Sequence, residues 1–507
     1  MLQKQNNPIL NPGSGGVNEK VAGHLVGDNQ AAPPDSSTLA LKNCHTDTIG
    51  SIVKRKGYTV YGGAYTNVDQ VTGLTQYEKF NGNTFEILCG DDDATEKIYD
   101  ISTPASPVDI TGSATITSDS NWDFANVADT LVMTNEARDT PLKWTGSSNV
   151  ASLGGTPPSG KYCEEFQNYC FIANTSSNPE RVYWSGLFDP ESWTTGSDFK
   201  RLENACTAMV KRDSVLFLFT LNSITIVTYT DDPVTPFNFD RLDTNVGCVS
   251  NRTVVNIEGV IYWLSRDGHI YRMSGFKPER VTEAIPNTIA SLTASALTNA
   301  CAINHRQLRQ YWCCVRRGTS TTNNFVVVVD YLNNEIFFYD GMEINSIANF
   351  KDSSGEVKTY FGDRNGKAYI TNNGNSDNPN SVETGIDFYR YSKMFNLSEP
   401  NKEKRFRNIK LTVNNEGDFT SEVSVTGDFG ATGGQALTLS HNGGEDLLGS
   451  TFTLGTSELG KKEDLPTRND IALNARYIQI KVTNDQADQP VIVRDMSFEY
   501  QTYQRNA

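Results

Sequence analysis

The stretch VNIEGVIYWLSRDGHIYRMSG, residues 255–275, decides the fold class. It holds two apolar, strand-like runs that meet at an Asp-Gly turn, and a second Gly closes it. Asp-Gly and Asn-Gly readily adopt the positive φ angles that two-residue hairpin turns need. The stretch therefore predicts a β-hairpin followed by a further turn.

The same plan recurs in looser forms along the chain. The comparable stretches are YEKFNGNTFEIL (77–88), NVADTLVMTNEARDTPLKWTGSS (126–148), EEFQNYCFIANTSSNPERVYWSG (164–186), VKRDSVLFLFTLNSITIVTYT (210–230), FVVVVDYLNNEIFFYDG (325–341) and KTYFGDRNGKAYITNNG (358–374). A spacing of roughly 40 to 50 residues between such units is typical of β-propeller blades. We predict an all-β fold with a β-propeller of about six or seven blades over residues 51–375. A run of β-sandwiches is the alternative, and it predicts more evenly spaced turns without a recurring closing Gly.

The two ends of the chain have a different character. Residues 1–50 are rich in Asn, Gly, Pro and Ser, which predicts an extended N-terminal arm that becomes ordered only against another surface, such as a neighbouring subunit. The stretch 372–385 has linker composition. Beyond it, apolar and polar residues alternate in strands such as 475–485, which predicts a separate C-terminal β-sandwich over residues 376–507. One helix is expected over residues 287–298, after Pro286.

Composition narrows the possible functions. The net charge is −16, and a surface this acidic argues against tight nucleic-acid binding through a broad basic face. The N-terminus lacks a signal-peptide pattern, and no apolar run approaches the ~18 residues of a membrane span. We therefore expect a protein made in the cytosol, with reduced and mostly buried thiols and with Asn-x-Ser/Thr triplets that carry no sugar. The nine cysteines, among which no CxxC spacing occurs, are Cys44, Cys89, Cys163, Cys170, Cys206, Cys248, Cys301, Cys313 and Cys314.

The motifs that suggest chemistry each lack a required part. GTPPSGK (155–161) has the spacing of a phosphate loop, but Tyr162 follows Lys161 where Ser or Thr is needed, and two Pro remove backbone donors. The Ser51–Lys54 pair has no partner motif. Asp91, Asp92 and Asp93 lack the alternating oxygen ligands of a calcium loop and are expected in a solvated turn.

The remaining candidate residues also favour a structural interpretation. We expect the basic clusters 54–56 and 402–407 to be local features, the second at an interface or a solvated sheet edge. The tryptophans are expected in blade packing before carbohydrate platforms. The histidines show no metal-ligand spacing, so we predict no catalytic, cofactor-binding or metal-ligating residue and no enzyme. The six tryptophans are Trp122, Trp144, Trp184, Trp193, Trp263 and Trp312, and the five histidines are His24, His45, His269, His305 and His441.

Four stretches together resemble the tail hub, or nozzle, proteins of short-tailed bacteriophages, also called packaged-DNA stabilisation proteins. They are KNCHTDTIGSIVKRKGY (42–58), where Lys56 replaces the Pro expected in relatives, NYCFIANTSSNPERVYWSGLFDPESW (168–193), GCVSNRTVVNIEGVIYWLSRDGHIYRMSGFKPERVTEAI (247–285) and KRFRNIKLTVNNEGDF (404–419). The resemblance implies a structural protein of the virion tail, without enzymatic activity or cofactor. Its copies would form a ring, with about six-fold symmetry, below the portal and its adaptor.

The implied ring would contact tail fibres or spikes, hold DNA in its channel without specific binding, and release it at infection. Two alternatives stay open. One is a carbohydrate-binding or glycan-degrading propeller that serves as a receptor-binding protein, because sequence cannot exclude two facing carboxylates among 60 acids. The other is a monomeric intracellular scaffold.

Overall fold

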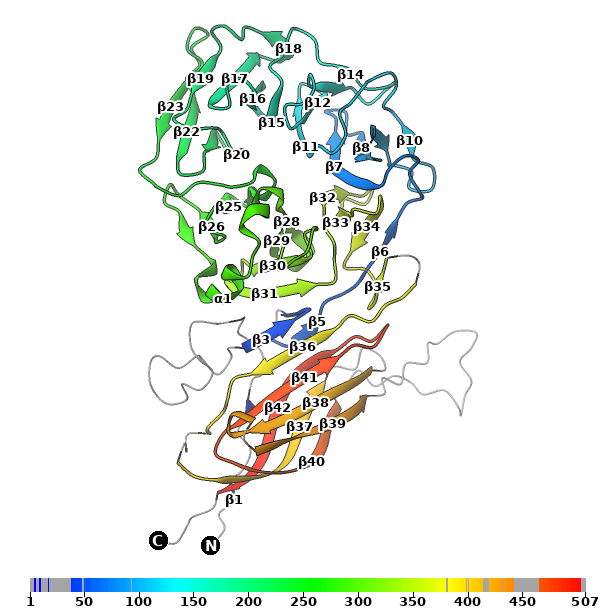
Figure 1. Ribbon diagram of the computed structural model, residues 1–507, viewed down its shortest axis with the longest axis vertical. Coiled ribbons are helices and arrows are strands. Elements are labelled where there is room, and N and C mark those ends of the chain that lie inside the picture. The colour runs from blue at the N-terminus through cyan, green and yellow to red at the C-terminus, as the bar shows by residue number, and fades with distance from the viewer. Residues whose placement is uncertain are drawn as a thin grey trace.

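The computed structural model is built almost entirely of antiparallel β-sheets, in a propeller and a sandwich (Figure 1). The helical segments are short: α1 (Pro286–Ala290), η1 (Asn251–Thr253), η2 (Thr282–Ala284), η3 (Ala294–Asn299), η4 (Arg306–Leu308) and η5 (Asp428–Gly430). The structure describes residues 4, 5, 9, 10, 17, 38–47, 50–92, 94–379, 382–397, 399, 401–413, 419–430, 432–441 and 465–502.

Seven sheets surround one axis (Figure 1). The first three are β7 (Gln70–Glu78), β8 (Thr84–Asp91), β9 (Glu96–Asp100) and β10 (Val108–Asp109); β11 (Trp122–Val127), β12 (Thr130–Asn135), β13 (Leu142–Trp144) and β14 (Ala151–Ser152); and β15 (Gly160–Phe166), β16 (Tyr169–Thr175), β17 (Arg181–Gly186), β18 (Asp189–Trp193) and β19 (Phe199–Arg201). The next three are β20 (Ala208–Arg212), β21 (Val215–Phe219), β22 (Ile224–Tyr229) and β23 (Phe237–Arg241); β24 (Val255–Ile257), β25 (Val260–Leu264), β26 (Ile270–Met273) and β27 (Glu279–Arg280); and β28 (Cys301–His305), β29 (Gln310–Val315), β30 (Phe325–Asp330) and β31 (Glu335–Asp340). The seventh contains β32 (Ser346–Lys351), β33 (Val357–Gly362), β34 (Ala368–Thr371), β6 (Tyr58–Tyr61) and β35 (Asp377–Asn378).

The innermost strands β7, β11, β15, β20, β24, β28 and β32 contact one another in that order, and β32 also contacts β7. The ring is therefore closed, and the predicted all-β propeller is confirmed. β6, which precedes the first sheet in sequence, pairs with β34 of the last sheet, so that Tyr58 faces Thr371. This pairing closes the ring by hydrogen bonds, because the two ends of the propeller segment share one sheet.

The deciding stretch contains one strand more than its sequence suggests. Glu258 and Gly259 adopt φ angles of 50° and 83° and form a tight turn that pairs β24 with β25. The predicted hairpin around the Asp-Gly pair is β25–β26, and Gly268 there has a φ of 78°. The first strand escaped notice because Glu is an uncommon residue at a positive φ angle.

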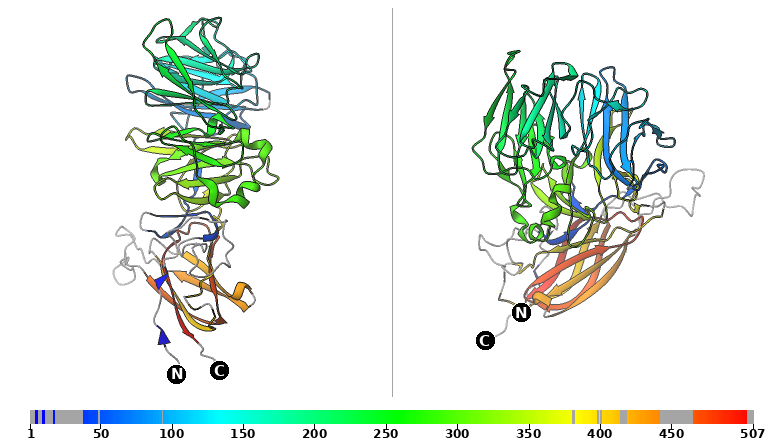
Figure 2. Two further views of the ribbon diagram at one scale, coloured as in Figure 1. Left: turned by 90° about the vertical axis from the view of Figure 1, so that its left-hand side faces the viewer. Right: turned by 45° about the horizontal axis from the view of Figure 1, so that its top comes forward.

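Two sheets form the C-terminal sandwich, as the period-two alternation predicts (Figures 1 and 2). One runs β4-β5-β42-β37-β40, with β1 and β2 also paired to β42, and the other runs β3-β36-β41-β38-β39. These strands are β1 (Lys4–Gln5), β2 (Ile9–Leu10), β3 (Thr38–Lys42), β4 (Cys44–Thr46), β5 (Ile52–Lys54), β36 (Phe388–Ser392), β37 (Lys404–Val413), β38 (Phe419–Gly427), β39 (Thr432–His441), β40 (Leu465–Ala475), β41 (Ile478–Asn484) and β42 (Ile492–Thr502).

The domain boundaries differ from those expected. Residues 38–54 supply β3, β4 and β5 to the two sandwich sheets, although they are far from the other sandwich strands in sequence. The described parts of residues 1–37 also bind to other segments of their own chain. β1 and β2 pair with β42, and the Val17 amide donates to the Ile336 carbonyl. The surface against which these residues of the expected arm 1–50 are ordered is thus their own chain. Most of residues 1–37, including His24, lie outside the described part of the chain.

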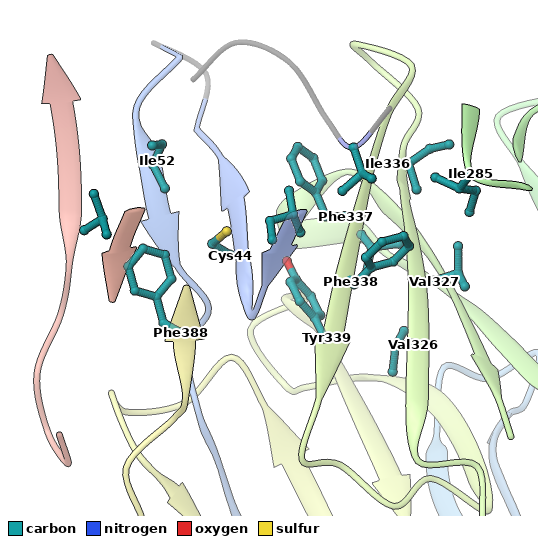
Figure 3. Close-up of a cluster of buried hydrophobic side chains, with 14 of the residues drawn as sticks. Cys44, Ile52, Ile285, Val326, Val327, Ile336, Phe337, Phe338, Tyr339 and Phe388 are labelled. Carbon is teal, nitrogen blue, oxygen red and sulfur yellow. The ribbon is translucent and has the colours of Figure 1, made fainter. Parts of the chain in front are cut away.

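One hydrophobic core runs from the propeller into the sandwich (Figure 3). Val326 and Phe337 belong to the sheet of β28–β31, Cys44 and Ile52 to the N-terminal strands, and Phe388 to β36; each is at most 1% exposed. The sandwich is therefore not a separate unit, because its strands β3 and β4 pack against β31 of the propeller.

The expected helix over 287–298 is wrong. The segment contains α1 and η3, separated by Thr293 in an extended conformation. The Thr293 amide donates to the Arg316 carbonyl and its hydroxyl to the Gly318 carbonyl. These tertiary hydrogen bonds interrupt a stretch whose Thr and Ser residues favour helix only weakly.

Candidate functional site

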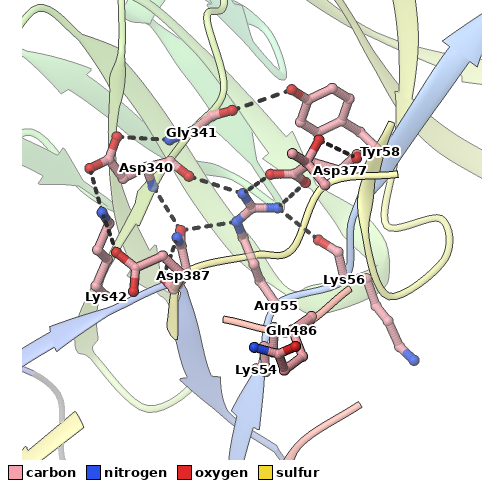
Figure 4. Close-up of polar contacts among 12 residues, drawn as sticks. Lys42, Lys54, Arg55, Lys56, Tyr58, Asp340, Gly341, Asp377, Asp387 and Gln486 are labelled. Atoms are coloured by element: carbon pink, nitrogen blue, oxygen red, sulfur yellow. Dashed lines mark hydrogen bonds and ion pairs between the residues drawn. The ribbon is translucent and has the colours of Figure 1, made fainter. Parts of the chain in front are cut away.

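Arg55 forms a clamp where the propeller meets the sandwich (Figure 4). Its Nη1 and Nη2 donate to the two carboxylate oxygens of Asp377 at 2.7 and 2.6 Å, and Nη2 also donates to the Asp340 carbonyl at 2.9 Å. Both side chains of the ion pair are at most 10% exposed. A paired and hydrogen-bonded Arg is stable here, whereas either partner alone would be a buried, uncompensated charge.

Asn43 connects the clamp to both domains. Its Oδ1 accepts from Arg55 Nε at 3.0 Å and from the Asp340 amide at 2.8 Å, and its Nδ2 donates to the Asp387 carbonyl at 2.8 Å. Asn43 has a φ of 54°, a conformation that Asn tolerates better than most residues. Nearby, Lys42 Nζ lies 3.1 Å from carboxylate oxygens of both Asp340 and Asp387. The junction is thus a hydrogen-bonded network that holds β31, β35 and β36 together.

The two basic clusters of the sequence are structural. Lys54 Nζ donates to Asn484 and to the Gln486 carbonyl, and burial lowers the pKa of Lys54 to about 8. Lys404 is fully buried, and its Nζ donates to the carbonyls of Glu399, Lys402 and Arg476. The expected position at a sheet edge is wrong for 402–407, because β37 lies between β42 and β40 inside its sheet, although Lys402, Arg405 and Arg407 are exposed. The alternative expectation of an interface stays a prediction.

The segment η1 lies at the centre of the propeller and binds strands from four other sheets. Asn251 Nδ2 donates to Asp123 at 2.9 Å, and Asn251 Oδ1 accepts from the Met209 amide at 2.9 Å. Arg252 donates from Nη1 and Nη2 to the carbonyls of Asn345 and Asn299, which lie at the starts of β32 and β28. The axis at this face is therefore occupied by the chain itself.

A pocket of about 370 Å3 lies beside η1, on the face where the innermost strands begin; we call it the axial pocket. Asp123, partly buried there, also accepts from the Cys163 amide at 3.0 Å, and burial raises the pKa of Asp123 to about 7. Burial likewise raises the pKa of Glu164, on the neighbouring β15, to about 8, against the lowering effect of Lys211. The residues that line the axial pocket include Asp123, Glu136, Lys161, Asn174, Asn251 and Arg252. Such groups can exchange protons near neutral pH and accept hydrogen bonds from a small polar ligand.

The rejected sequence motifs occupy ordinary structural positions. Gly155–Gly160 connects β14 to β15, and Lys161 lies in β15 with no helix after it. Ser51 and Lys54 belong to the sandwich. Asp91 is fully buried and accepts from the Asp119 amide, so the expected solvated turn is wrong for this residue. Asp92 is partly exposed and accepts from the Ala94 and Thr95 amides of the turn, whereas Asp93 lies outside the described residues.

The cysteines and most of the tryptophans pack in the interior of the protein. All nine cysteines are buried and free, as predicted. Trp122, Trp144, Trp263 and Trp312 are buried, which confirms their predicted role in blade packing. Within the described residues, no group of three His, Cys, Asp or Glu side chains could hold a metal ion. The side chain of His441 lies outside the described part.

Two histidines are buried as neutral rings. Burial lowers the pKa of His45 to about 4 and that of His305 to about 3. His45 Nδ1 lies 3.0 Å from the Tyr339 hydroxyl, and the His305 ring stacks on Trp312 at 4.5 Å. Sequence reasoning missed the polar contacts of η1 and the clamp, because they join residues far apart in the chain. Neither set has a local signature.

No protein-family model matches the chain. No curated protein matches its sequence. Among solved structures, the chain is similar to virginiamycin B lyase from Staphylococcus aureus, with 13% identity over 62% of this chain and 98% of that one and a TM-score of 0.42. It is also similar to the computationally designed Ika8 protein, with 11% identity over 62% and 99% of the two chains and a TM-score of 0.38.

A third similar structure is PorZ, a bacterial surface component of the type-IX secretion system of Porphyromonas gingivalis. It has 13% identity over 68% of this chain and 44% of that one, with a TM-score of 0.39. At these scores, none of the three bears on function. Separately, the described residues contain no helix with the length and apolar character needed to cross a bilayer.

Proposed function

We propose that this chain is a structural subunit of the tail hub, or nozzle, of a short-tailed bacteriophage. In this function, its copies form a ring of about six beneath the portal and its adaptor, contact tail fibres or spikes, and release DNA at infection. The protein acts mechanically in the virion tail and catalyses no reaction.

The observation that carries the proposal is the construction of the junction. A closed ring of sheets is stiff, and the shared core together with the Arg55–Asp377 clamp supports one rigid body made of propeller and sandwich. Rigid wedge-shaped subunits suit a ring that bears the load of packaged DNA. Because η1 occupies the axis of the propeller, DNA would pass between subunits, along the axis of the ring. The net charge of −16 would limit ion pairing with phosphates there.

Exposed apolar side chains on one face supply a surface for assembly. Phe80, Phe188, Val234, Phe276 and Leu332 are 54–85% exposed. Each lies in a turn at the face where the innermost strands end, which we call the turn face. They come from turns of five different sheets, and we propose that they serve as separate contact points between copies.

The test is electron microscopy of the purified chain over a range of concentrations, alone and with a portal–adaptor complex. We expect class averages of a ring, with the propellers repeated around a central hole. Single, separate particles under every condition would contradict the proposal. A double variant, Phe188→Ser with Phe276→Ser, is expected to reduce ring formation if the turn face is the contact. The matched control is Leu221→Ser at the opposite face.

A glycan-binding propeller is the second candidate function. One observation favours it, namely a pocket on the turn face that combines tyrosine, asparagine and arginine side chains. A hub ring and a glycan site can exist in the same chain, so each candidate stands on its own observation.

A further inference from the structure

A second pocket lies on the turn face between the fifth and sixth sheets. It has a volume of about 730 Å3, within the roughly 300–1,000 Å3 range of small-molecule sites. Its walls are the β24–β25, β28–β29 and β30–β31 turns. The principal lining side chains are Tyr262, Asn304, Arg306, Arg309, Tyr331 and Leu332, and we call this the tyrosine–arginine pocket.

The two arginines of this pocket are uncompensated. Neither Arg306 nor Arg309 makes a side-chain hydrogen bond or an ion pair within the described part of the chain. Glu258 also lines the pocket but pairs with neither. By contrast, Arg272, also at the turn face, forms an ion pair with Glu279. In a chain with 60 acidic and 44 basic residues, two arginines that line one pocket without a carboxylate partner offer a local site for an anion.

The backbone of Arg309 has an uncommon conformation that fixes the turn between η4 and β29. Arg309 has φ and ψ of 56° and 46°, a left-handed conformation that non-glycine residues seldom adopt. It follows η4 directly and turns the chain into β29, while its carbonyl accepts from the Tyr331 amide at 3.4 Å. The turn that carries both arginines is therefore tied to the turn that carries Tyr331.

The remaining walls combine apolar and polar surface. Tyr262 is 3% exposed and stacks on Tyr311, with ring centroids 5.4 Å apart and an interplanar angle of 27°, so it forms a fixed floor beneath the pocket. The Tyr331 hydroxyl donates to Asn304 Oδ1 at 3.4 Å, which leaves the Asn304 amide nitrogen as a donor for a ligand. Leu332 is 56% exposed at the rim. Aromatic and apolar surface beside a few polar groups is the usual lining of a ligand site.

We propose that the tyrosine–arginine pocket binds an acidic saccharide. An arginine guanidinium can bind a carboxylate through two parallel hydrogen bonds, and the Asn304 amide and Tyr331 hydroxyl can bind sugar hydroxyls. The partly exposed Tyr331 ring and the exposed Leu332 side chain can pack on the apolar face of a sugar ring. Glu258 accepts from sugar hydroxyls and limits affinity for small, highly charged anions. This inference rests on the glycan-binding candidate and is independent of the hub, which assembles whether or not the pocket is filled.

The test is isothermal titration of the full chain against three acidic saccharides: tri-galacturonic acid, sialyl-lactose and a phosphorylated oligosaccharide. Neutral galactotriose and lactose, inorganic phosphate and an acidic peptide are titrated in parallel. We expect saturable binding of at least one acidic saccharide and at least ten-fold weaker binding of its neutral counterpart. The R306A/R309A double variant should bind at least ten-fold more weakly, and E258Q should bind the acidic saccharide more tightly.

The control variant is R266A, which removes an exposed arginine at the opposite face and should leave binding unchanged. Thermal unfolding of each variant checks that it is folded. The proposal is overturned if none of the acidic saccharides binds, if neutral sugars bind equally well, if phosphate or the acidic peptide binds better than every saccharide, or if folded R306A/R309A binds like the wild-type chain. Electron microscopy of the same preparation shows separately whether rings form. The hub proposal and the saccharide proposal can therefore be contradicted independently of each other.

Discussion

Asn251 and Asp123 are joined by a hydrogen bond of 2.9 Å, although 128 residues separate them in sequence. Asp123 lies on β11, the innermost strand of the second sheet, whereas Asn251 belongs to η1, ahead of the fifth sheet. Asn251 also accepts from the Met209 amide of the fourth sheet. One amide side chain thus satisfies polar groups from two other sheets across the centre of the propeller.

The first prediction concerns this central amide. Asn251→Ala leaves the Met209 amide without its partner and removes one of the hydrogen bonds of Asp123, which keeps the bond from the Cys163 amide. Since an unpaired buried amide costs roughly 1–3 kcal/mol, we expect the free energy of unfolding to fall by about that amount. Denaturant unfolding followed by tryptophan fluorescence measures it. Asn149→Ala, at an exposed turn residue, is the control, and equal stability of the two variants would contradict the central role of Asn251.

The second prediction concerns pH. Asp123 and Glu164 have pKa values raised by burial to about 7 and about 8, so the folded chain holds protons that the unfolded chain releases above pH ~4. Their contribution to stability is full below pH ~4 and is lost as the pH rises through 7 and 8. The buried histidines act in the opposite sense. Below pH ~6.5 the unfolded chain binds protons at His45 and His305 that the folded chain does not bind, so these residues lower the free energy of unfolding as the pH falls.

The carboxyls therefore dominate between pH 6.5 and about 7.5, together with Glu96, whose pKa burial also raises to about 8. At higher pH Lys54 acts in the opposite sense, because burial lowers its pKa to about 8 and the unfolded chain keeps the proton that the folded chain releases. We expect the free energy of unfolding to decrease across the interval in which the carboxyls dominate, measured by urea unfolding at several pH values. Glu164→Gln should flatten the slope, whereas Glu403→Gln, which alters an exposed carboxyl, should preserve it. A slope that is unchanged in Glu164→Gln would show that this carboxyl does not hold the proton.

The propeller could be predicted because its signals are local. Asn-Gly and Asp-Gly turns and apolar runs define hairpins such as β7–β8 and β25–β26, and their spacing reveals the repeat. The alternation in β41 likewise identified a strand with one buried face. Each of these features depends on neighbouring residues, so the sequence displays it directly.

The connections between distant segments could not be predicted in this way. Residues 38–54 have few apolar residues in a row, and they become strands because β36 and β42 offer edges to pair with. Asp91 and Lys404 have ordinary polar surroundings in sequence and are buried by contacts from elsewhere in the chain. The axial pocket and the clamp depend on such contacts entirely, and so their residues carried no recognisable motif.

The third prediction concerns the clamp. Asp377→Asn or Arg55→Met leaves one buried, uncompensated partner, and we expect a loss of about 3–5 kcal/mol in the free energy of unfolding. The control is Arg241→Met, which breaks an exposed pair with Glu203 and should cost under about 1 kcal/mol. Limited proteolysis adds a second measurement, because a loosened junction should be cut faster between β35 and β36. If Arg55→Met resists protease as well as Arg241→Met does, the clamp does not hold the two domains together.

The fourth prediction distinguishes an arm that serves a neighbouring subunit from strands that serve their own chain. Deleting residues 1–36 removes β1 and β2 but retains β3, so we expect a folded protein whose particle size, measured by light scattering, matches that of the full chain. Deleting residues 1–56 also removes β3–β5 and Arg55, which exposes apolar side chains such as Phe388 and leaves Asp377 unpaired. That variant should aggregate or bind a hydrophobic dye, while the shorter deletion should do neither. If the shorter deletion instead reduced the particle size, the first 36 residues would have to contact a neighbouring subunit in addition to β42.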